Sequence, residues 1–218
     1  MNDRPGDCCF DGWASANAKR ARRRETAARI TGRLVEALER AGLEGRTVLD
    51  LGCGAGDLAL TTLARGAAAA TGLDLGAGAV ASARSLATTR GLAARARFEV
   101  GDAAVAPLSR HDVVVLNRVL CCYHDPGPLL DNALGATGSV FAITAPVDRG
   151  LGGAWNRFLT ATGNLWYAAR RARYRGFRVF VHPLEPVAAM VGRAGLAPLV
   201  HERHGLWDMT VYVRDGVR

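Results

Sequence analysis

The feature that most constrains this chain is a glycine-rich stretch over Val48–Asp57, which reads Val-Leu-Asp-Leu-Gly-Cys-Gly-Ala-Gly-Asp. An apolar run ends in an acid, three glycines follow at alternating positions, and a helix-like pattern of leucines comes next. That order predicts a strand, a tight turn and a helix. Glycine is needed where a chain turns sharply or where a ligand approaches the backbone. A helix start also presents free N–H groups, so we expect a ligand-binding turn here.

The turn differs from one that binds a dinucleotide. A dinucleotide-binding turn reads G-x-G-x-x-G, whereas this one reads G-x-G-x-G and is preceded by Asp50. A carboxylate at this position would sit poorly beside a pyrophosphate, but it suits a ligand that carries an ammonium group. The turn therefore disfavours a nicotinamide-dependent oxidoreductase.

Three further apolar segments end in polar side chains, at Asp74, Asp102 and Asn117. Asp74 lies where a Rossmann-like fold places the carboxylate that binds ribose hydroxyls. The segment before Asn117 is continuously apolar, as a strand buried on both faces should be. Each acid alone could be a structural turn residue, because aspartate favours turns. Together they predict a parallel sheet whose strands end at one ligand site.

These segments resemble the motifs of class I S-adenosylmethionine (SAM) methyltransferases, over about the first half of the chain. The resemblance implies that SAM is the cofactor, with its methionine part on the glycine turn, its ribose on Asp74 and its adenine near Asp102. The cofactor-binding residues that it implies are Asp50, Gly52, Cys53, Gly54, Gly56, Asp74, Leu75, Asp102, Ala103 and Asn117. Cys53 is expected as a small residue of the turn, not as a reactive thiol.

A wider similarity covers most of the chain. The segments at 8–13, 118–123 and 177–183, together with the glycine turn, resemble small bacterial methyltransferases that are likened to magnesium-protoporphyrin O-methyltransferases. In such sequences we expect proline where His124 stands, so this chain departs from their pattern. The departure bears on the acceptor, because a porphyrin carboxylate needs no base to accept a methyl group.

The loop after the fourth segment holds the candidate catalytic residues. His124 is the candidate general base, since an imidazole titrates near neutral pH. Tyr123 is expected to orient the acceptor, and Asp125 to orient the imidazole. Asp125 before Pro126 is equally a helix-start signal, which would make His124 an ordinary loop residue. His182 precedes a proline and a helix, and it could cap that helix or line the pocket.

The formal net charge of +8 is concentrated in two basic clusters, at residues 19–24 and 170–178. Basic clusters bind nucleic acid or anionic small molecules, but they are also typical of a solvated helix face. Aromatic residues interleave with the second cluster, which suits either base stacking or an apolar helix face. Nucleic acid is therefore kept as the less favoured partner, and the basic rim favours an acidic small-molecule acceptor.

The five cysteines do not predict a disulfide framework, because their number is odd and they include two adjacent pairs. Zinc ligands are usually spaced two to four residues apart, so Cys8–Cys9, Cys121–Cys122 and His124 predict no metal site. No apolar run reaches the length of a membrane span, and the start of the chain does not resemble a secretory signal. A cytoplasmic protein is expected, of unknown oligomeric state.

We predict one α/β domain over 1–218, with a Rossmann-like, mostly parallel seven-stranded sheet, helices on both faces and an antiparallel C-terminal strand. Its parts are an N-terminal helical lid (1–45), a cofactor-binding core (46–146), a helical substrate-side insertion (147–183) and a C-terminal helix and hairpin (184–218). Strands are expected near 47–51, 69–74, 96–100, 112–117 and 139–144, and a β-like run at 177–181. Helices are expected near 15–42, 57–65, 77–90, 126–135, 152–176 and 184–194, and a hairpin at 197–202 and 209–214.

The sequence thus predicts an enzyme that transfers a methyl group from SAM to an oxygen or nitrogen of a small-molecule acceptor. The inserted helix suggests an enclosed acceptor pocket. Three alternatives stay open: methylation of tRNA through the basic clusters, SAM chemistry other than methylation such as cyclisation or aminopropyl transfer, and a non-enzymatic partner subunit.

Overall fold

A computed structural model describes residues 21–170, 177–214 and 216 of the chain. Residues 1–20 of the predicted lid (1–45), which include Lys19 and Arg20 of the first basic cluster, lie outside the described residues. Residues 171–176 of the predicted insertion lie outside them as well. Cys8 and Cys9 lie outside them too.

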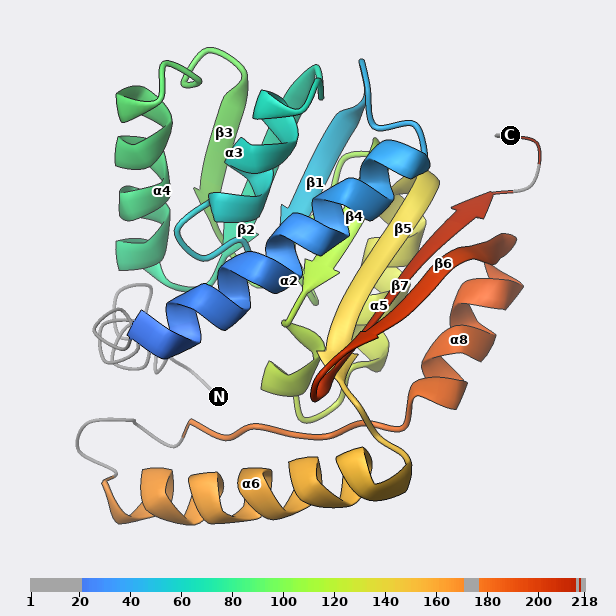
Figure 1. The fold of residues 1–218 in the computed structure, drawn as a ribbon. Coiled ribbons are helices and arrows are strands. Elements are labelled where there is room, and N and C mark those ends of the chain that lie inside the picture. Colours follow the sequence, from blue (N-terminus) through green and yellow to red (C-terminus); the bar gives the residue numbers. More distant parts are fainter. Residues whose placement is uncertain (1–20, 171–176, 215, 217–218) are drawn as a thin grey trace.

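The core is one seven-stranded sheet with the strand order β3-β2-β1-β4-β5-β7-β6 (Figure 1). The strands β1 to β5 run parallel, whereas β7 runs antiparallel to both β5 and β6. The strands are β1 (Thr47–Leu51), β2 (Ala69–Asp74), β3 (Ala96–Val100), β4 (His111–Asn117), β5 (Thr137–Pro146), β6 (Leu196–His204) and β7 (Trp207–Arg214). The predicted sheet is confirmed, and β5 is longer than expected at both ends.

Helices cover both faces of the sheet because the strands are apolar on both sides (Figure 1). Val48, Val113 and Val115 pack with α2, α3 and α4, whereas Leu49 and Val114 pack with α5 and α8. The helices are α2 (Ala21–Arg40), α3 (Asp57–Ala64), α4 (Ala77–Thr89), η1 (Leu120–Cys122), α5 (Gly127–Ala136), α6 (Gly150–Ala169) and α8 (Leu184–Arg193). Along each strand, successive side chains alternate between the two cores.

The strand order reverses between β1 and β4, which are hydrogen-bonded neighbours. Each is followed by a connection to a different side of the sheet, and in open α/β sheets the ligand crevice lies at the carboxyl ends of such strands. The glycine turn follows β1, and the loop that holds Tyr123 and His124 follows β4. The topology therefore places the predicted cofactor turn beside the predicted catalytic loop.

The insertion after β5 contains a long helix, α6, which lies beyond the carboxyl ends of the parallel strands (Figure 1). Residues 177–183 return between α6 and the sheet in extended form. The predicted β-like run at 177–181 is wrong, because this segment forms no strand. The side chain of Asn164 bonds both the N–H and the C=O of Val179, at 2.8 Å each. Those groups would otherwise be free for pairing with a neighbouring strand.

Candidate active site

Asp50 is buried beneath the glycine turn, at 1% exposure. Burial raises the pKa of its carboxyl to about 7, and the negative charge of Asp74 adds to this, whereas the backbone N–H of Ala59 and the charge of Arg118 lower the pKa. Its Oδ2 has no hydrogen-bond partner among the described residues. A buried carboxylate oxygen without a donor is costly, and a bound cationic group would remove that cost.

Arg118 begins the loop after β4 and is held in an unusual backbone conformation, with φ of 63°. Its Nε is buried and, like Asp50 Oδ2, has no hydrogen-bond partner among the described residues. The two side chains are close enough for the charge of each to affect the pKa of the other. Within the described part of the chain neither buried atom has a partner, so the site has one free acceptor and one free donor.

The turn itself is held against β2. The N–H groups of Gly52 and Cys53 both donate to the carbonyl of Leu73, at 2.7 and 3.1 Å. Gly54 has a φ of +54°, and a Cβ built on it would meet no atom of the described residues within 4 Å. The backbone is thus bare and open at Gly54, as the approach of a ligand requires. At Gly52, by contrast, a Cβ would lie 2.4 Å from a methyl of Val119, so glycine there lets the two loops pack.

Asp74 links the turn to the end of β2. Its Oδ2 accepts the N–H of Gly54 and its Oδ1 accepts the N–H of Gly76, both at 2.8 Å. Each carboxylate oxygen can accept a second hydrogen bond, so Asp74 keeps acceptor capacity for a ligand hydroxyl. Leu75, the next residue, is half-buried. These bonds fix the carboxylate beside the exposed backbone of Gly54.

Asp102 stands at the start of the loop after β3, two residues beyond Val100. Its Oδ1 accepts the N–H of Ala104 at 3.0 Å and the hydroxyl of Tyr123 at 2.7 Å. Ala103 is buried beside it. Burial raises the pKa of the Tyr123 phenol well above its ordinary value, and the bond to Asp102 adds to the shift. Tyr123, predicted to orient the acceptor, thus has its hydroxyl engaged by the carboxylate that was predicted to face adenine.

Asn117, at the end of β4, is also fixed by the protein. Its Oδ1 accepts the hydroxyl of Thr144 at 2.7 Å, and its Nδ2 donates to Thr31 at 3.1 Å. The amide therefore joins β4 to β5 and to α2. These bonds fix the end of β4 directly before Arg118. The cofactor contact expected of Asn117 stays a prediction.

His124 lies at the mouth of the crevice and is exposed. Its ring meets that of Phe180 edge-on at 5.3 Å, and Phe180 lies 5.9 Å from the ring of His182. The N–H of Phe180 donates to the carbonyl of Cys121, and the Nε2 of His182 is 2.8 Å from the carbonyl of Tyr123. Two imidazoles and a phenyl ring are thereby gathered where the returning segment crosses the loop.

Asp125 is placed as a helix cap. Its Oδ1 accepts the N–H of Gly127 at 3.0 Å, and no hydrogen bond joins it to His124 in the described part of the chain. The expectation that Asp125 orients the imidazole is therefore not met, because the carboxylate satisfies a free N–H at the start of α5. Phe180 and His182 are the neighbours that border His124 and its loop instead.

The cysteines near the site are buried or half-buried. Burial raises the pKa of the Cys53 thiol well above its ordinary value, which agrees with a packing role in the turn. Cys121 and Cys122 follow Arg118, with their sulfur atoms 4.0 Å apart. Within the described residues, no group of three His, Cys, Asp or Glu side chains is placed to hold a metal ion.

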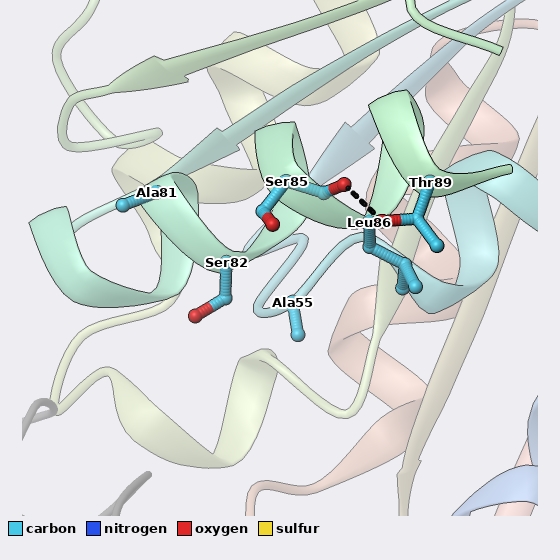
Figure 2. Close-up of a pocket in the computed structure, with 6 residues that line it drawn as sticks. All are labelled: Ala55, Ala81, Ser82, Ser85, Leu86 and Thr89. Atoms are coloured by element: carbon cyan, nitrogen blue, oxygen red, sulfur yellow. Dashed lines mark hydrogen bonds between the residues drawn. The ribbon is translucent and has the colours of Figure 1, made fainter. Parts of the chain in front are cut away.

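A shallow hollow of about 510 Å³ lies between Ala55 of the glycine turn and the surface of α4. Figure 2 shows its walls: Ala55 from the turn and Ala81, Ser82, Ser85, Leu86 and Thr89 from α4. None of the predicted site residues lines it. The hollow is therefore separate from the crevice that holds Asp50, Asp74 and Arg118.

Sequence reasoning brought the strand-end residues to one edge of the sheet, and the structure places them there. It missed Arg118 and Phe180. The signal for Arg118 was available, because a lone arginine directly after a buried apolar strand is an unusual place for a charge. Phe180 had no such signal, because its role depends on where the chain returns after α6.

The methyltransferase domain family matches residues 43–169, which is more than half of the chain. The chain therefore belongs to the methyltransferase domain family, as a class I SAM-dependent methyltransferase, and its fold is that of this class.

The ribosomal protein L11 methyltransferase of Pectobacterium carotovorum (strain PC1) is 36% identical over 96 residues, which are 44% of this chain and 32% of that protein. The chain thus spans about a third of the length of this curated relative. The matched stretch of 96 residues is about as long as the predicted cofactor-binding core (46–146).

Two solved structures share the fold. One is the magnesium protoporphyrin IX methyltransferase of Synechocystis PCC 6803 with bound SAH (S-adenosylhomocysteine), with a TM-score of 0.67, 19% identity, and coverage of 87% of this chain and 83% of that one. The other is an O-methyltransferase family protein from Burkholderia thailandensis, with a TM-score of 0.66, 22% identity, and coverage of 85% and 56%. At these identities the likeness concerns the fold.

Proposed function

We propose that this protein transfers a methyl group from SAM to an oxygen or nitrogen of a small-molecule acceptor and releases SAH. Bound SAM supplies an electrophilic methyl group on a positively charged sulfur. The protein then has to bind the cofactor, align the acceptor and take up the acceptor's proton where it has one. The described residues are suited to each of these tasks.

The observation that carries the proposal is the pair of unsatisfied buried atoms, Asp50 Oδ2 and Arg118 Nε. One is a hydrogen-bond acceptor on an acid and the other is a donor on a base. The amino-acid end of SAM carries an ammonium group and a carboxylate, so it complements both atoms. A nicotinamide dinucleotide would bring only anionic phosphates to this part of the turn. The pair therefore fits SAM and gives a reason for the acid before the glycines.

The remaining cofactor contacts follow from the order of the strands. Asp74, fixed by the N–H groups of Gly54 and Gly76, would accept hydrogen bonds from the ribose hydroxyls. Asp102 and Ala103 would border the adenine, with Tyr123 holding the Asp102 carboxylate in place. The methyl group would then point toward the loop after β4, where His124, Phe180 and His182 gather.

For an acceptor with an acidic proton, His124 is the proposed base. It is exposed at the crevice mouth, and its edge-on contact with Phe180 limits the orientations of the ring. His182 supports the same loop through its bond to the carbonyl of Tyr123. Phe180 offers an apolar surface, so an aromatic or otherwise planar acceptor suits this wall.

A macromolecular acceptor is the second candidate. The likeness to a ribosomal protein L11 methyltransferase and the basic cluster at 170–178 favour it. The matched part of that relative is confined to a third of its length, and basic charge alone has little specificity. We therefore place the small-molecule acceptor first.

The test compares SAH with methylthioadenosine, which lacks the amino-acid end. Calorimetry on the wild type should give an affinity at least about tenfold higher for SAH than for methylthioadenosine, because only SAH can make the two charge-assisted contacts. In Asp50→Asn and Arg118→Met the preference should collapse, while methylthioadenosine binds as before. If both variants keep the wild-type preference for SAH, the amino-acid end does not lie on Asp50 and Arg118 and the proposal fails.

A further inference from the structure

The helix α6 presents its apolar face to the solvent. Six large apolar side chains on α6 are exposed, and Leu151 (92%), Trp155 (54%) and Phe158 (56%) are the first three along the helix. The complete set, here called the outward stripe, is Leu151, Trp155, Phe158, Leu159, Leu165 and Trp166. With 3.6 residues per turn, all six fall within about a third of the helix circumference. Trp155 and Phe158 stack on each other at 5.4 Å.

The opposite face of α6 is small and polar, and it is the one that faces the protein. Gly153 and Asn156 are buried there. Asn156 donates to the carbonyls of Val147 and Leu206, both at 2.9 Å, and Asn164 makes two bonds to Val179. An amphipathic helix on a globular protein normally turns its apolar side inward. Here polar anchors hold α6 in the reverse orientation, so the exposure of the stripe is built into the packing.

The charge of this region has one sign. Residues 150–178 contain six arginines and no acidic residue, while the other 189 residues carry 22 basic and 20 acidic side chains. Most of the formal net charge of +8 therefore comes from this stretch. Arg170 lies over the ring of Trp166, with its guanidinium carbon 4.3 Å from the ring centre. Positive charge thus borders the outward stripe directly.

We propose that the outward stripe is a docking surface for an anionic lipid membrane, on which α6 lies parallel to the surface. Trp, Phe and Leu on one side of a helix, in a stretch of sequence that holds arginines and no acid, are the features of an interfacial helix. Tryptophan and arginine both favour the boundary between head groups and acyl chains. Within the described residues no helix is long and apolar enough to cross a membrane, so the contact is peripheral.

A second copy of the chain is a poorer match for the same surface. Two stripes brought face to face would bring together two copies of the stretch 150–178, each with six arginines and no acid to offset them. A membrane that contains acidic lipids supplies both the apolar layer and the opposite charge. Charge complementarity therefore favours lipid over self-association.

The experiment is co-sedimentation of the full-length protein with vesicles. Vesicles of phosphatidylcholine with phosphatidylglycerol should bind the wild type, with a blue shift of tryptophan fluorescence, and vesicles of phosphatidylcholine alone should bind it much more weakly. The variant W155S/F158S should bind the anionic vesicles about tenfold more weakly or worse, because two inserting side chains are lost. Raised salt should weaken wild-type binding as well.

A matched variant, V105S/L199S, removes two exposed apolar side chains outside α6 and should bind like the wild type. Thermal melting and SAH affinity show whether each variant is folded. Equal vesicle binding by W155S/F158S and the wild type would overturn the proposal. So would a wild type that ignores anionic vesicles but forms a dimer, or binds tRNA, through a surface that W155S/F158S destroys.

Discussion

The hydroxyl of Tyr123 donates a 2.7 Å hydrogen bond to Oδ1 of Asp102. This bond joins the loop after β4, which carries the candidate base, to the loop after β3, which is proposed to border adenine. The same oxygen accepts the N–H of Ala104. The proposed cofactor and acceptor sides of the crevice therefore share one polar contact. A substitution on one side should alter binding on the other.

We expect Tyr123→Phe to lower the free energy of unfolding by about 1–2 kcal/mol, because a hydrogen bond to a charged group is lost. It should also weaken SAH binding, since Asp102 loses its fixed orientation. Chemical denaturation and calorimetry measure the two effects. In a double-mutant cycle with Asp102→Asn the effects should not add. Additive losses would mean that the bond does not couple the two loops.

The pKa of about 7 at Asp50 gives a pH dependence to stability. The unfolded carboxyl ionises near its ordinary value of 3.8, so between about pH 4 and 7 the folded protein holds more protons than the unfolded one. The contribution of Asp50 to stability should therefore fall as the pH rises through this window and level off above it. Denaturation of the wild type and Asp50→Asn at several pH values isolates this contribution as their difference.

SAH binding should depend on pH in the opposite sense. An ammonium group is attracted to the ionised carboxylate, whose population rises from roughly a tenth at pH 6 to roughly nine tenths at pH 8 for a pKa of about 7. We expect the affinity of the wild type to rise by up to about ninefold over this range. Titration at both pH values checks it, with Asp50→Asn as the variant that should show no rise. A flat wild-type profile would argue against an Asp50–ammonium contact.

Gly54 offers a test of the open backbone. Gly54→Ala introduces a Cβ that meets no protein atom within 4 Å but lies at a φ of +54°. The strain should cost about 1 kcal/mol of stability. Gly91→Ala, at a φ of +68° and equally free of contacts, is the matched control outside the crevice. Gly54→Ala alone should weaken SAH binding, by about tenfold or more. Equal SAH affinity in Gly54→Ala and Gly91→Ala would mean that the cofactor does not approach the backbone of Gly54.

A catalytic role of His124 can be distinguished from a role in cofactor binding by comparing turnover with SAH affinity. With an acceptor that must lose a proton, His124→Gln should lower kcat by about a hundredfold or more, the usual scale for a general base, and leave SAH affinity unchanged. His111→Gln, at the opposite end of β4, is the control. Wild-type turnover in His124→Gln would assign the proton to another group or to water.

Much of the fold could be predicted from the sequence because its signals are local. Buried parallel strands are short apolar runs, and the acid or amide after each run marks its carboxyl end. Asp74 and Asn117 indeed close β2 and β4, and Asp50 is the residue before the last of β1. The run at 177–181 was predicted wrongly because its apolar pattern suits a strand, whereas pairing depends on a neighbour. Asn164 satisfies the backbone of Val179 in place of such a neighbour.

For the candidate site, the sequence likewise predicted where the residues lie in the fold. Residue type and position along the chain placed the acids at one edge of the sheet. They did not reveal that Tyr123 is bound to Asp102, that Asp125 caps α5, or that Phe180 reaches His124. Two of those contacts join segments that are distant in sequence. In the third, Asp125 accepts the N–H of Gly127 and not a hydrogen bond from His124. The orientation of α6 was hidden for a similar reason, since periodicity shows that a helix has an apolar face but not what that face meets.

Calorimetric titration of the folded protein with SAH, and separately with NADH, is the decisive test of the cofactor site. We expect one SAH site of micromolar affinity, lost in Asp50→Asn, and no binding of NADH. A folded wild-type protein that fails to bind SAH, or that binds NADH in its place, would contradict the cofactor site on Asp50, Gly54 and Asp74.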